Sequence, residues 1–115
     1  MGHYTLEDVR FLLDEGACEF ATFKCRRDVY ELDLTGADAQ EIVRLLQPAD
    51  FRKSFGNCST DFGDVDGDDY ILWCDLARKT RVAAGQGTKL YIKLAIHTNP
   101  DACLIISFHE SKPSW

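Results

Sequence analysis

Residues 89–97 read Lys89-Leu-Tyr-Ile-Lys-Leu-Ala-Ile-His97, and residues 104–109 read Leu104-Ile-Ile-Ser-Phe-His109. Side chains of a strand alternate between two faces, so apolar residues at every second position indicate two half-buried strands. The apolar set comprises Leu90, Ile92, Leu94, Ile96, Leu104, Ile106 and Phe108. The opposite face then carries Lys89, Tyr91, Lys93, His97, Ser107 and His109. A solvated sheet face needs polar groups, but it has no need for this combination of Tyr, Lys and His.

The two strands are expected to pair antiparallel across a short turn at residues 99–101. Matching their apolar faces requires an even sum of paired residue numbers. A three-residue turn then sets Tyr91 opposite His109 and Lys93 opposite Ser107. The apolar pairs in this register are Ile96 with Leu104 and Ile92 with Phe108.

Length and composition place the chain among globular proteins. We expect one domain spanning residues 1–115, large enough to bury a core. The sequence has neither an apolar run of the roughly 20 residues that a membrane span needs nor a signal segment, so we expect a cytoplasmic protein with no membrane partner. Its five cysteines include no C-x-x-C pair. We therefore expect no disulfide framework, no metal site and no cofactor.

The charge is unevenly distributed along the chain. The formal net charge is −6, yet residues 1–69 carry seven basic and sixteen acidic side chains. Residues 70–115 carry six basic and three acidic side chains. This segregation favours a basic face on an acidic body, with chance clustering as the alternative, so the net charge does not exclude a nucleic-acid ligand.

Helices are expected in the first half. A capping box at Thr5 and a stop at Gly16 predict the first, and a segment capped by Thr35 and ended by Pro48 predicts another. Between them, residues 17–34 suggest an extended piece followed by a short helix. Residues 48–55 predict a further short helix that turns Phe51 and Phe55 toward the core.

The remainder is expected to form sheet. The acidic stretch 61–69 is interpreted as a solvated loop; a calcium loop is the weaker alternative, because its glycine is misplaced. Residues 70–76 and 80–84 indicate strands that precede the two already described. The predicted fold is α+β, with N-terminal helices on one face of a C-terminal antiparallel sheet.

The order of these segments resembles the MqsR family, toxins of bacterial toxin–antitoxin pairs with a RelE-like fold. The matching stretches are Asp50-Phe-Arg-Lys-Ser54, Ile71-Leu-Trp-Cys-Asp75, Gly85-Gln, Leu90-Tyr-Ile-Lys93, Ile96-His97 and Leu104-Ile-Ile-Ser-Phe-His-Glu110. The resemblance implies a metal-independent mRNA endonuclease that is neutralised by a cognate antitoxin. Its implied catalytic positions hold Lys53, Cys74, Tyr91 and His109. Cys74 replaces a family Gln, and His109 replaces a family Lys.

These residues suit cleavage of single-stranded RNA by its own 2′-hydroxyl. His109 or Tyr91 can act as acid, and clustered cations are expected to bring Lys53 or Tyr91 toward a base role. Phosphates would be held by a wider set of basic residues. The candidates for RNA binding are Arg52, Arg78, Arg81, Lys89, Lys93 and His97.

Two other functions remain open. The first is a catalytically weak or inactive protein of the same fold that keeps antitoxin and RNA binding, as the departures at Cys74 and His109 suggest. The second is a small-ligand domain that uses the sheet face as a pocket. That function would favour an apolar lining, which Lys89, Tyr91 and Lys93 do not supply.

Overall fold

The computed structural model describes residues 2–98 and 101–111 and confirms the α+β class. Its helices are α1 (Leu6–Asp14), α2 (Phe23–Glu31), α3 (Gly36–Val43) and the short 3-10 helix η1 (Pro48–Asp50). Its strands are β1 (Cys18–Phe20), β2 (Phe51–Thr60), β3 (Gly63–Asp75), β4 (Thr80–Arg81), β5 (Thr88–His97) and β6 (Ala102–Glu110). No helix in the described part of the chain is long and apolar enough to cross a bilayer.

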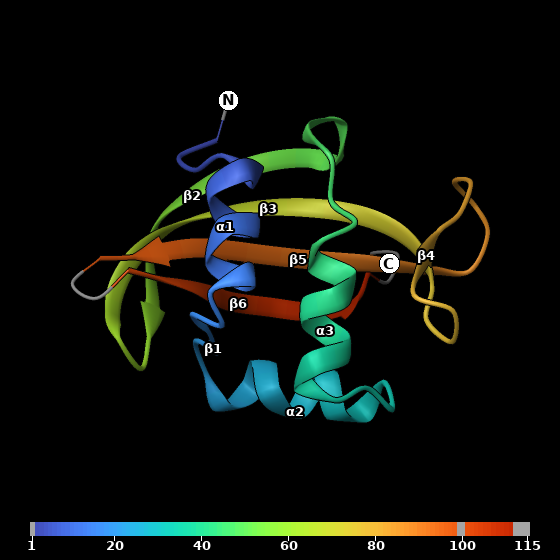
Figure 1. Cartoon of the computed structure of the whole chain (residues 1–115), viewed down its shortest axis with the longest axis horizontal. Coiled ribbons are helices and arrows are strands. Elements are labelled where there is room, and N and C mark those ends of the chain that lie inside the picture. Colours follow the sequence, from blue (N-terminus) through green and yellow to red (C-terminus); the bar gives the residue numbers. More distant parts are fainter. Residues whose placement is uncertain (1, 99–100, 112–115) are drawn as a thin grey trace, which may run out of the picture.

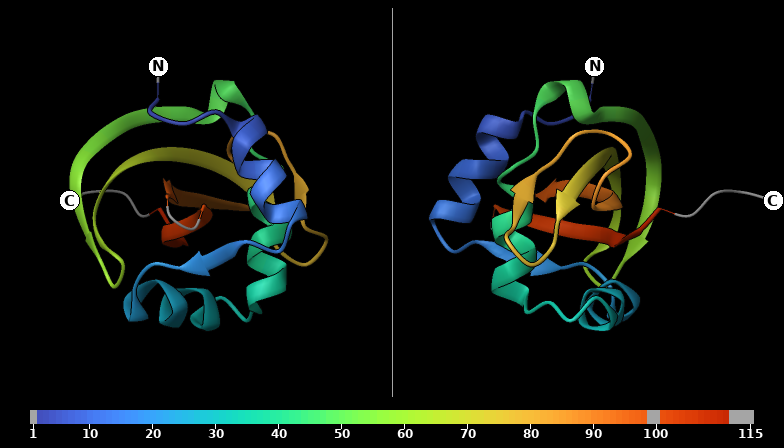
Figure 2. Two further views of the ribbon diagram at one scale, coloured as in Figure 1. Left: turned by 60° about the vertical axis from the view of Figure 1, so that its left-hand side comes forward. Right: turned by 90° about the vertical axis from the view of Figure 1, so that its right-hand side faces the viewer.

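The sheet has the strand order β1-β6-β5-β3-β2, with β4 added beside β3. All pairs are antiparallel except β1 with β6, which is parallel, so the prediction of a purely antiparallel sheet is wrong at this edge. Helices α1 and α3 cross one face of the sheet, and α2 runs beneath the β1–β6 edge (Figure 1). Strands β2 and β3 curl round so that their hairpin end comes close to the segment between β1 and α2 (Figure 2), where the backbone N–H of Asp61 donates to the carbonyl oxygen of Ala21.

The helix boundaries follow from their caps. The Thr5 hydroxyl accepts the backbone N–H of Asp8 at the start of α1, and Gly16, with φ 71°, ends that helix. Thr35 and Asp38 form a reciprocal capping box at the start of α3. The predicted caps at Thr5, Gly16 and Thr35 are therefore confirmed. Residues 17–34 form β1 and α2, which agrees with the expected extended piece followed by a short helix. However, α3 ends at Val43, before Pro48.

The core lies between the sheet and the helices. Leu90, Ile92 and Phe108 are fully buried there, and they pack in one cluster with Leu12 of α1 and Ile42 of α3. The alternation in β5 therefore predicts its buried face correctly. A different apolar cluster lies on the other side of the sheet and consists of Ala21, Ala95, Leu104 and Ile106.

A β-bulge explains this smaller cluster and corrects the predicted faces of β6. Lys93 pairs with Ser107, but Leu94 pairs with Ile105, so Ile106 is an extra residue on β6. Beyond the bulge every residue of β6 changes face, and Ile96 pairs with Cys103 instead of Leu104. The predicted turn falls partly on residues 99–100, which lie outside the described residues.

Residues 48–69 differ most from the prediction. Only η1 is helical, and the chain then enters β2, which pairs with β3 along the hairpin. Residues 63–69 of the acidic stretch belong to β3, and only Asp61 and Phe62 lie in the hairpin turn. Asp68 and Asp69 are buried because both carboxylates have partners: Asp68 accepts hydrogen bonds from the backbone of His3 and Tyr4 and from the Ser54 hydroxyl. Strand 70–76 is confirmed within β3, and only Thr80–Arg81 of the strand expected at 80–84 forms.

Candidate functional site

Two rows of directly opposed residues cross the sheet on the face opposite α1 and α3, which we call the helix-free face and which α2 borders only at β6. In the first row Lys53 of β2, Asp69 of β3, Lys93 of β5 and Ser107 of β6 lie side by side. In the second row Tyr91 pairs with His109, and Ile71 lies on the other side of Tyr91. Directly opposed residues share one face of a sheet. The predicted pairing of Tyr91 with His109 and of Lys93 with Ser107 is therefore confirmed.

Tyr91 and His109 are in contact. Their rings are stacked with centroids 5.2 Å apart and planes inclined by 17°. The His109 Nδ1 atom lies 3.0 Å from the carbonyl oxygen of Glu110. Because a carbonyl oxygen only accepts hydrogen bonds, this contact places the ring hydrogen on Nδ1. Nε2 is then the atom that takes up or releases a proton.

The carboxylate of Asp69, in the first row, is buried. The Asp69 side chain is inaccessible to solvent, and its Oδ2 accepts a hydrogen bond of 2.8 Å from Nη1 of the half-exposed Arg52. The Arg52 guanidinium carbon lies 6.0 Å from the centre of the Tyr91 ring. Within residues 2–98 and 101–111, Oδ1 of Asp69 has no hydrogen-bond partner of normal geometry. This is the single buried side-chain oxygen or nitrogen in that part of the chain with none.

Tyr91 is kept in its protonated form. Burial raises the pKa of the Tyr91 hydroxyl, and the adjacent Asp69 carboxylate, which the hydroxyl approaches closely, raises it further. The charge of Arg52 acts in the opposite direction with a smaller effect. The expectation that neighbouring cations make Tyr91 a base by lowering its pKa is therefore wrong. Tyr91 enters any reaction as a neutral phenol.

Two lysines flank an aromatic ring beside this pair. Lys53 Nζ lies 4.9 Å and Lys93 Nζ lies 4.1 Å from the centre of the Phe55 ring. Lys93 Nζ is also 5.9 Å from the Tyr91 ring. Arg52 pairs with the buried Asp69 carboxylate, and Lys53 and Lys93 are the directly opposed neighbours of Asp69 in the sheet. Such a face can hold a phosphate between the cations and offers aromatic surfaces to a base.

Lys89 extends the basic face along β5. Its Nζ lies 5.8 Å from the ring of Trp73, which shares the helix-free face with Lys89 as its directly opposed partner. Trp73 is half-buried there instead of belonging to the core between sheet and helices. A cation beside an exposed aromatic face is a suitable contact for a nucleotide that lies next to the reacting phosphate.

Four residues of the predicted site lie elsewhere. Cys74 is fully buried in the core on the helix side of β3, so its inclusion is corrected: it cannot contact a substrate at Tyr91. Arg81 is held by both carboxylate oxygens of Asp50, at 2.6 and 2.9 Å, and by the carbonyl of Leu45, which commits it to the helix side. These placements remove both residues from the site.

Arg78 and His97 are also separated from the central pair. Arg78 lies in the turn after β3, where its backbone N–H donates to Asp75. His97 ends β5 against Phe62, with ring centroids 5.9 Å apart. Six residues of strand separate His97 from Tyr91, which corresponds to roughly 20 Å. Neither residue therefore belongs to the group of side chains around Tyr91.

Sequence reasoning missed Asp69 and misplaced Phe55. Asp69 was included in an acidic loop, and Phe55 was expected to anchor a helix to the core. One signal was available: Asp69, Ile71 and Trp73 share one parity, and Tyr70, Leu72 and Cys74 share the other. Extending the strand upstream by this parity places Asp69 on the face opposite Cys74.

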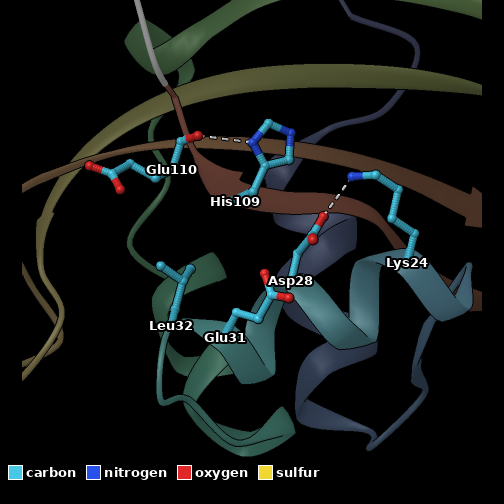
Figure 3. A pocket seen from close by; sticks show the side chains of 6 residues that line it. All are labelled: Lys24, Asp28, Glu31, Leu32, His109 and Glu110. Carbon is cyan, nitrogen blue, oxygen red and sulfur yellow. Dashed lines mark hydrogen bonds and ion pairs between the residues drawn. The ribbon is translucent and has the colours of Figure 1, made fainter.

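A cavity of about 570 Å³ lies on the other side of His109 (Figure 3). Its lining includes three carboxylates, those of Asp28, Glu31 and Glu110, together with Lys24. Lys24 is paired with Asp28 at 2.8 Å. The excess of negative charge makes this cavity unsuitable for a phosphate.

No curated protein and no solved structure matches the chain. A family model described as "Motility quorum-sensing regulator, toxin of MqsA" matches residues 1–110, which is nearly the whole chain. The match includes every strand that contributes to the helix-free face. The chain therefore belongs to the family of motility quorum-sensing regulators that are toxins of MqsA.

Proposed function

We propose that this protein is a metal-independent endoribonuclease that cuts single-stranded mRNA and thereby stops translation. Membership of the family supports its role as the toxin of a toxin–antitoxin system, with an antitoxin as partner. The single observation that carries the nuclease activity is the stacked pair of Tyr91 and His109 beside Lys53, Lys93 and Arg52 on one helix-free face. Its substrate, mRNA, places its action in the cytoplasm.

The reaction uses the nucleophile that RNA itself carries. The 2′-hydroxyl attacks the adjacent phosphorus, and the bond to the 5′-oxygen of the next nucleotide breaks. Lys53, Lys93 and Arg52 stabilise the negative charge that develops on the phosphoryl oxygens. Protonated His109 gives the Nε2 proton to the leaving 5′-oxygen. The products are a 2′,3′-cyclic phosphate and a 5′-hydroxyl.

Growth of bacterial cells tests the proposed function. Expression of the wild type alone should arrest growth, and co-expression of the protein encoded beside it should relieve the arrest. Tyr91→Phe and His109→Ala should abolish toxicity at equal soluble expression. Arg44→Ala is the matched control, because Arg44 forms an exposed ion pair with Asp14 on the helix side. Normal growth with soluble wild type would contradict the proposal.

A chelator tests the metal independence of the reaction. The proposed roles in binding and proton transfer are all held by side chains of this protein, so cleavage of a defined RNA should continue in EDTA. Activity that EDTA abolishes and Mg²⁺ restores would overturn this mechanism. The assay needs purified protein and an RNA substrate without bound metal.

The second candidate function is a catalytically weak protein of the same family that retains antitoxin and RNA binding. The burial of Cys74 favours it, because the family resemblance puts an amide-bearing catalytic residue at this position. It predicts RNA binding and antitoxin binding without cleavage or growth arrest. The growth and cleavage experiments therefore distinguish the two candidates.

A further inference from the structure

Asp69 has a partner for one carboxylate oxygen and none of normal geometry for the other. Oδ2 is bound by Arg52, while Oδ1 is buried without a hydrogen-bond donor among the described residues. A buried oxygen without a donor costs free energy, so such atoms are rare in folded proteins and often mark functional positions. Tyr91 is a diagonal neighbour of Asp69 on the helix-free face, and its hydroxyl is a hydrogen-bond donor that interacts with this carboxylate.

We propose that Asp69 is a positioning residue of the site: its Oδ1 accepts the phenolic hydrogen of Tyr91, which turns the Tyr91 oxygen toward the 2′-hydroxyl of the RNA. The role of this contact in a reaction rests on the proposed ribonuclease function. The contact itself is supported by the register of β3 and β5, which makes Tyr91 a diagonal neighbour of Asp69 on the same face of the sheet. The contact fixes the orientation of the Tyr91 hydroxyl. A phenol that donates its hydrogen to Asp69 has only its oxygen lone pairs left to face the substrate.

The proton balance of this arrangement closes. As the 2′-oxygen bonds to phosphorus, its proton passes to the Tyr91 oxygen and the phenolic proton passes to Asp69 Oδ1. The bond from phosphorus to the 5′-oxygen breaks, and that oxygen takes the Nε2 proton of His109. After the products leave, the carboxyl proton returns through Tyr91 to solvent, and His109 Nε2 takes up a proton from solvent. A neutral tyrosine can therefore accept a proton without first forming a free phenolate.

The surroundings of Asp69 explain why a carboxylate can remain charged there. Lys53 and Lys93 are its directly opposed neighbours on β2 and β5, and Arg52 contacts it. These three positive charges offset the cost of burying one negative charge. The same neighbours bind the phosphate, so removing the Asp69 charge should leave the face more positive and should not weaken the attraction for RNA.

The variant Asp69→Asn separates a positioning role from a purely structural one. The amide has the size of the carboxylate and can still accept a hydrogen bond through oxygen, but it cannot take the phenolic proton. We expect kcat to fall by about 100-fold or more, with KM for RNA unchanged or lower. Tyr91→Phe should cause a similar loss, and the double variant should lose no more than either alone, because both changes break one relay.

Asp68→Asn is the matched control for this experiment. Asp68 is the adjacent residue and equally buried, but it binds the N-terminal backbone and Ser54 on the other face of β3. Its variant should lower stability and leave kcat of the folded protein near the wild-type value. Loss of kcat and RNA affinity together in Asp69→Asn, or a wild-type kcat in this variant, would overturn the proposal.

A spectroscopic measurement tests the contact without any cleavage assay. In wild-type protein with ¹³C-labelled tyrosine, the Tyr91 ring signal, identified with Tyr91→Phe, should show no titration at the ordinary tyrosine value of about 10. In Asp69→Asn its midpoint should move down toward that value. A wild-type midpoint near 10 would refute the contact even if Asp69→Asn does not fold. Burial alone also raises this midpoint, so the contact stands only if the midpoint moves down in Asp69→Asn; with that shift and no RNA cleavage by wild type, the proposed function fails and the contact stands.

Discussion

Lys93→Ala is the variant that tests the phosphate-binding role of the helix-free face most quantitatively. Lys93 lies in the middle of the face, with Asp69 and Ser107 as its directly opposed neighbours. Its Nζ is held over the Phe55 ring at 4.1 Å and forms no ion pair within the described residues. Removing it should therefore leave the fold intact and remove one cation from the RNA-binding surface.

The magnitude follows from the number of cations on the face. Arg52, Lys53, Lys89 and Lys93 are available there, whereas Arg81 is bound to Asp50 on the helix side. Each phosphate contact with single-stranded RNA contributes about −0.7 to the slope of log affinity against log salt concentration. Four contacts predict a slope of about −2.8, and Lys93→Ala should reduce it to about −2.1. A fourfold rise in salt should then weaken binding about 50-fold in wild type and about 20-fold in the variant.

Fluorescence anisotropy with a 2′-O-methyl oligonucleotide measures this affinity, because the blocked 2′-oxygen cannot attack the phosphate. Arg44→Ala serves as the control, since it removes the same charge from the helix side. Its slope should equal that of wild type. The reasoning is refuted if binding is independent of salt, or if both variants change the slope equally.

Three further predictions concern pH and stability. A histidine side chain ordinarily loses its proton near neutral pH, and a lysine side chain does so at a much higher pH. His109→Lys should therefore move the alkaline limb of the pH–rate profile to higher pH. An unmoved limb would exclude His109 as the general acid. Burial raises the pKa of Cys25 from 9.0 to about 12 and of Tyr70 from 10.0 to about 12. The fold thus favours the neutral forms of both groups, so the free energy of unfolding should be constant below about pH 9 and fall at higher pH. Each group contributes a fall of about 1.4 kcal/mol per pH unit, Cys25 from about pH 9 and Tyr70 from about pH 10, in both cases up to about pH 12, as denaturant titrations can show. Asp68→Ala removes the acceptor of three hydrogen bonds. The free energy of unfolding of this variant should be lower than that of wild type by roughly 3 kcal/mol or more. A change below about 1 kcal/mol would mean that the N-terminal segment is not bound to the Asp68 carboxylate.

The sequence predicts the part of the site that rests on clear alternation. In β5 apolar and polar residues alternate without interruption up to Lys93, so the face of Tyr91 and its pairing with His109 follow from parity alone. The bulge at Ile106 could not be predicted in this way. Residues 104–106 are all apolar, so parity does not show where the face changes.

The start of β2 and the acidic stretch could not be predicted from the alternation of apolar and polar residues, for a different reason. Phe51 and Phe55 have the spacing of a helix face, but a bulge at Arg52 makes the same spacing compatible with a strand. Asp68 and Asp69 are typical of a solvated loop until their partners are known. Those partners are the N-terminal backbone and Arg52, which lie far away or across a hairpin. Only the tertiary structure brings them together.

The direct test of the central claim is cleavage of a 5′-labelled single-stranded RNA by purified protein in EDTA. The proposed site predicts internal cuts that leave 2′,3′-cyclic phosphate ends. Tyr91→Phe and His109→Ala should each cut at least about 100-fold more slowly while remaining folded, and Arg44→Ala should cut at the wild-type rate. Absence of cleavage by folded wild type, 3′-hydroxyl ends, or full activity of either site variant would contradict it.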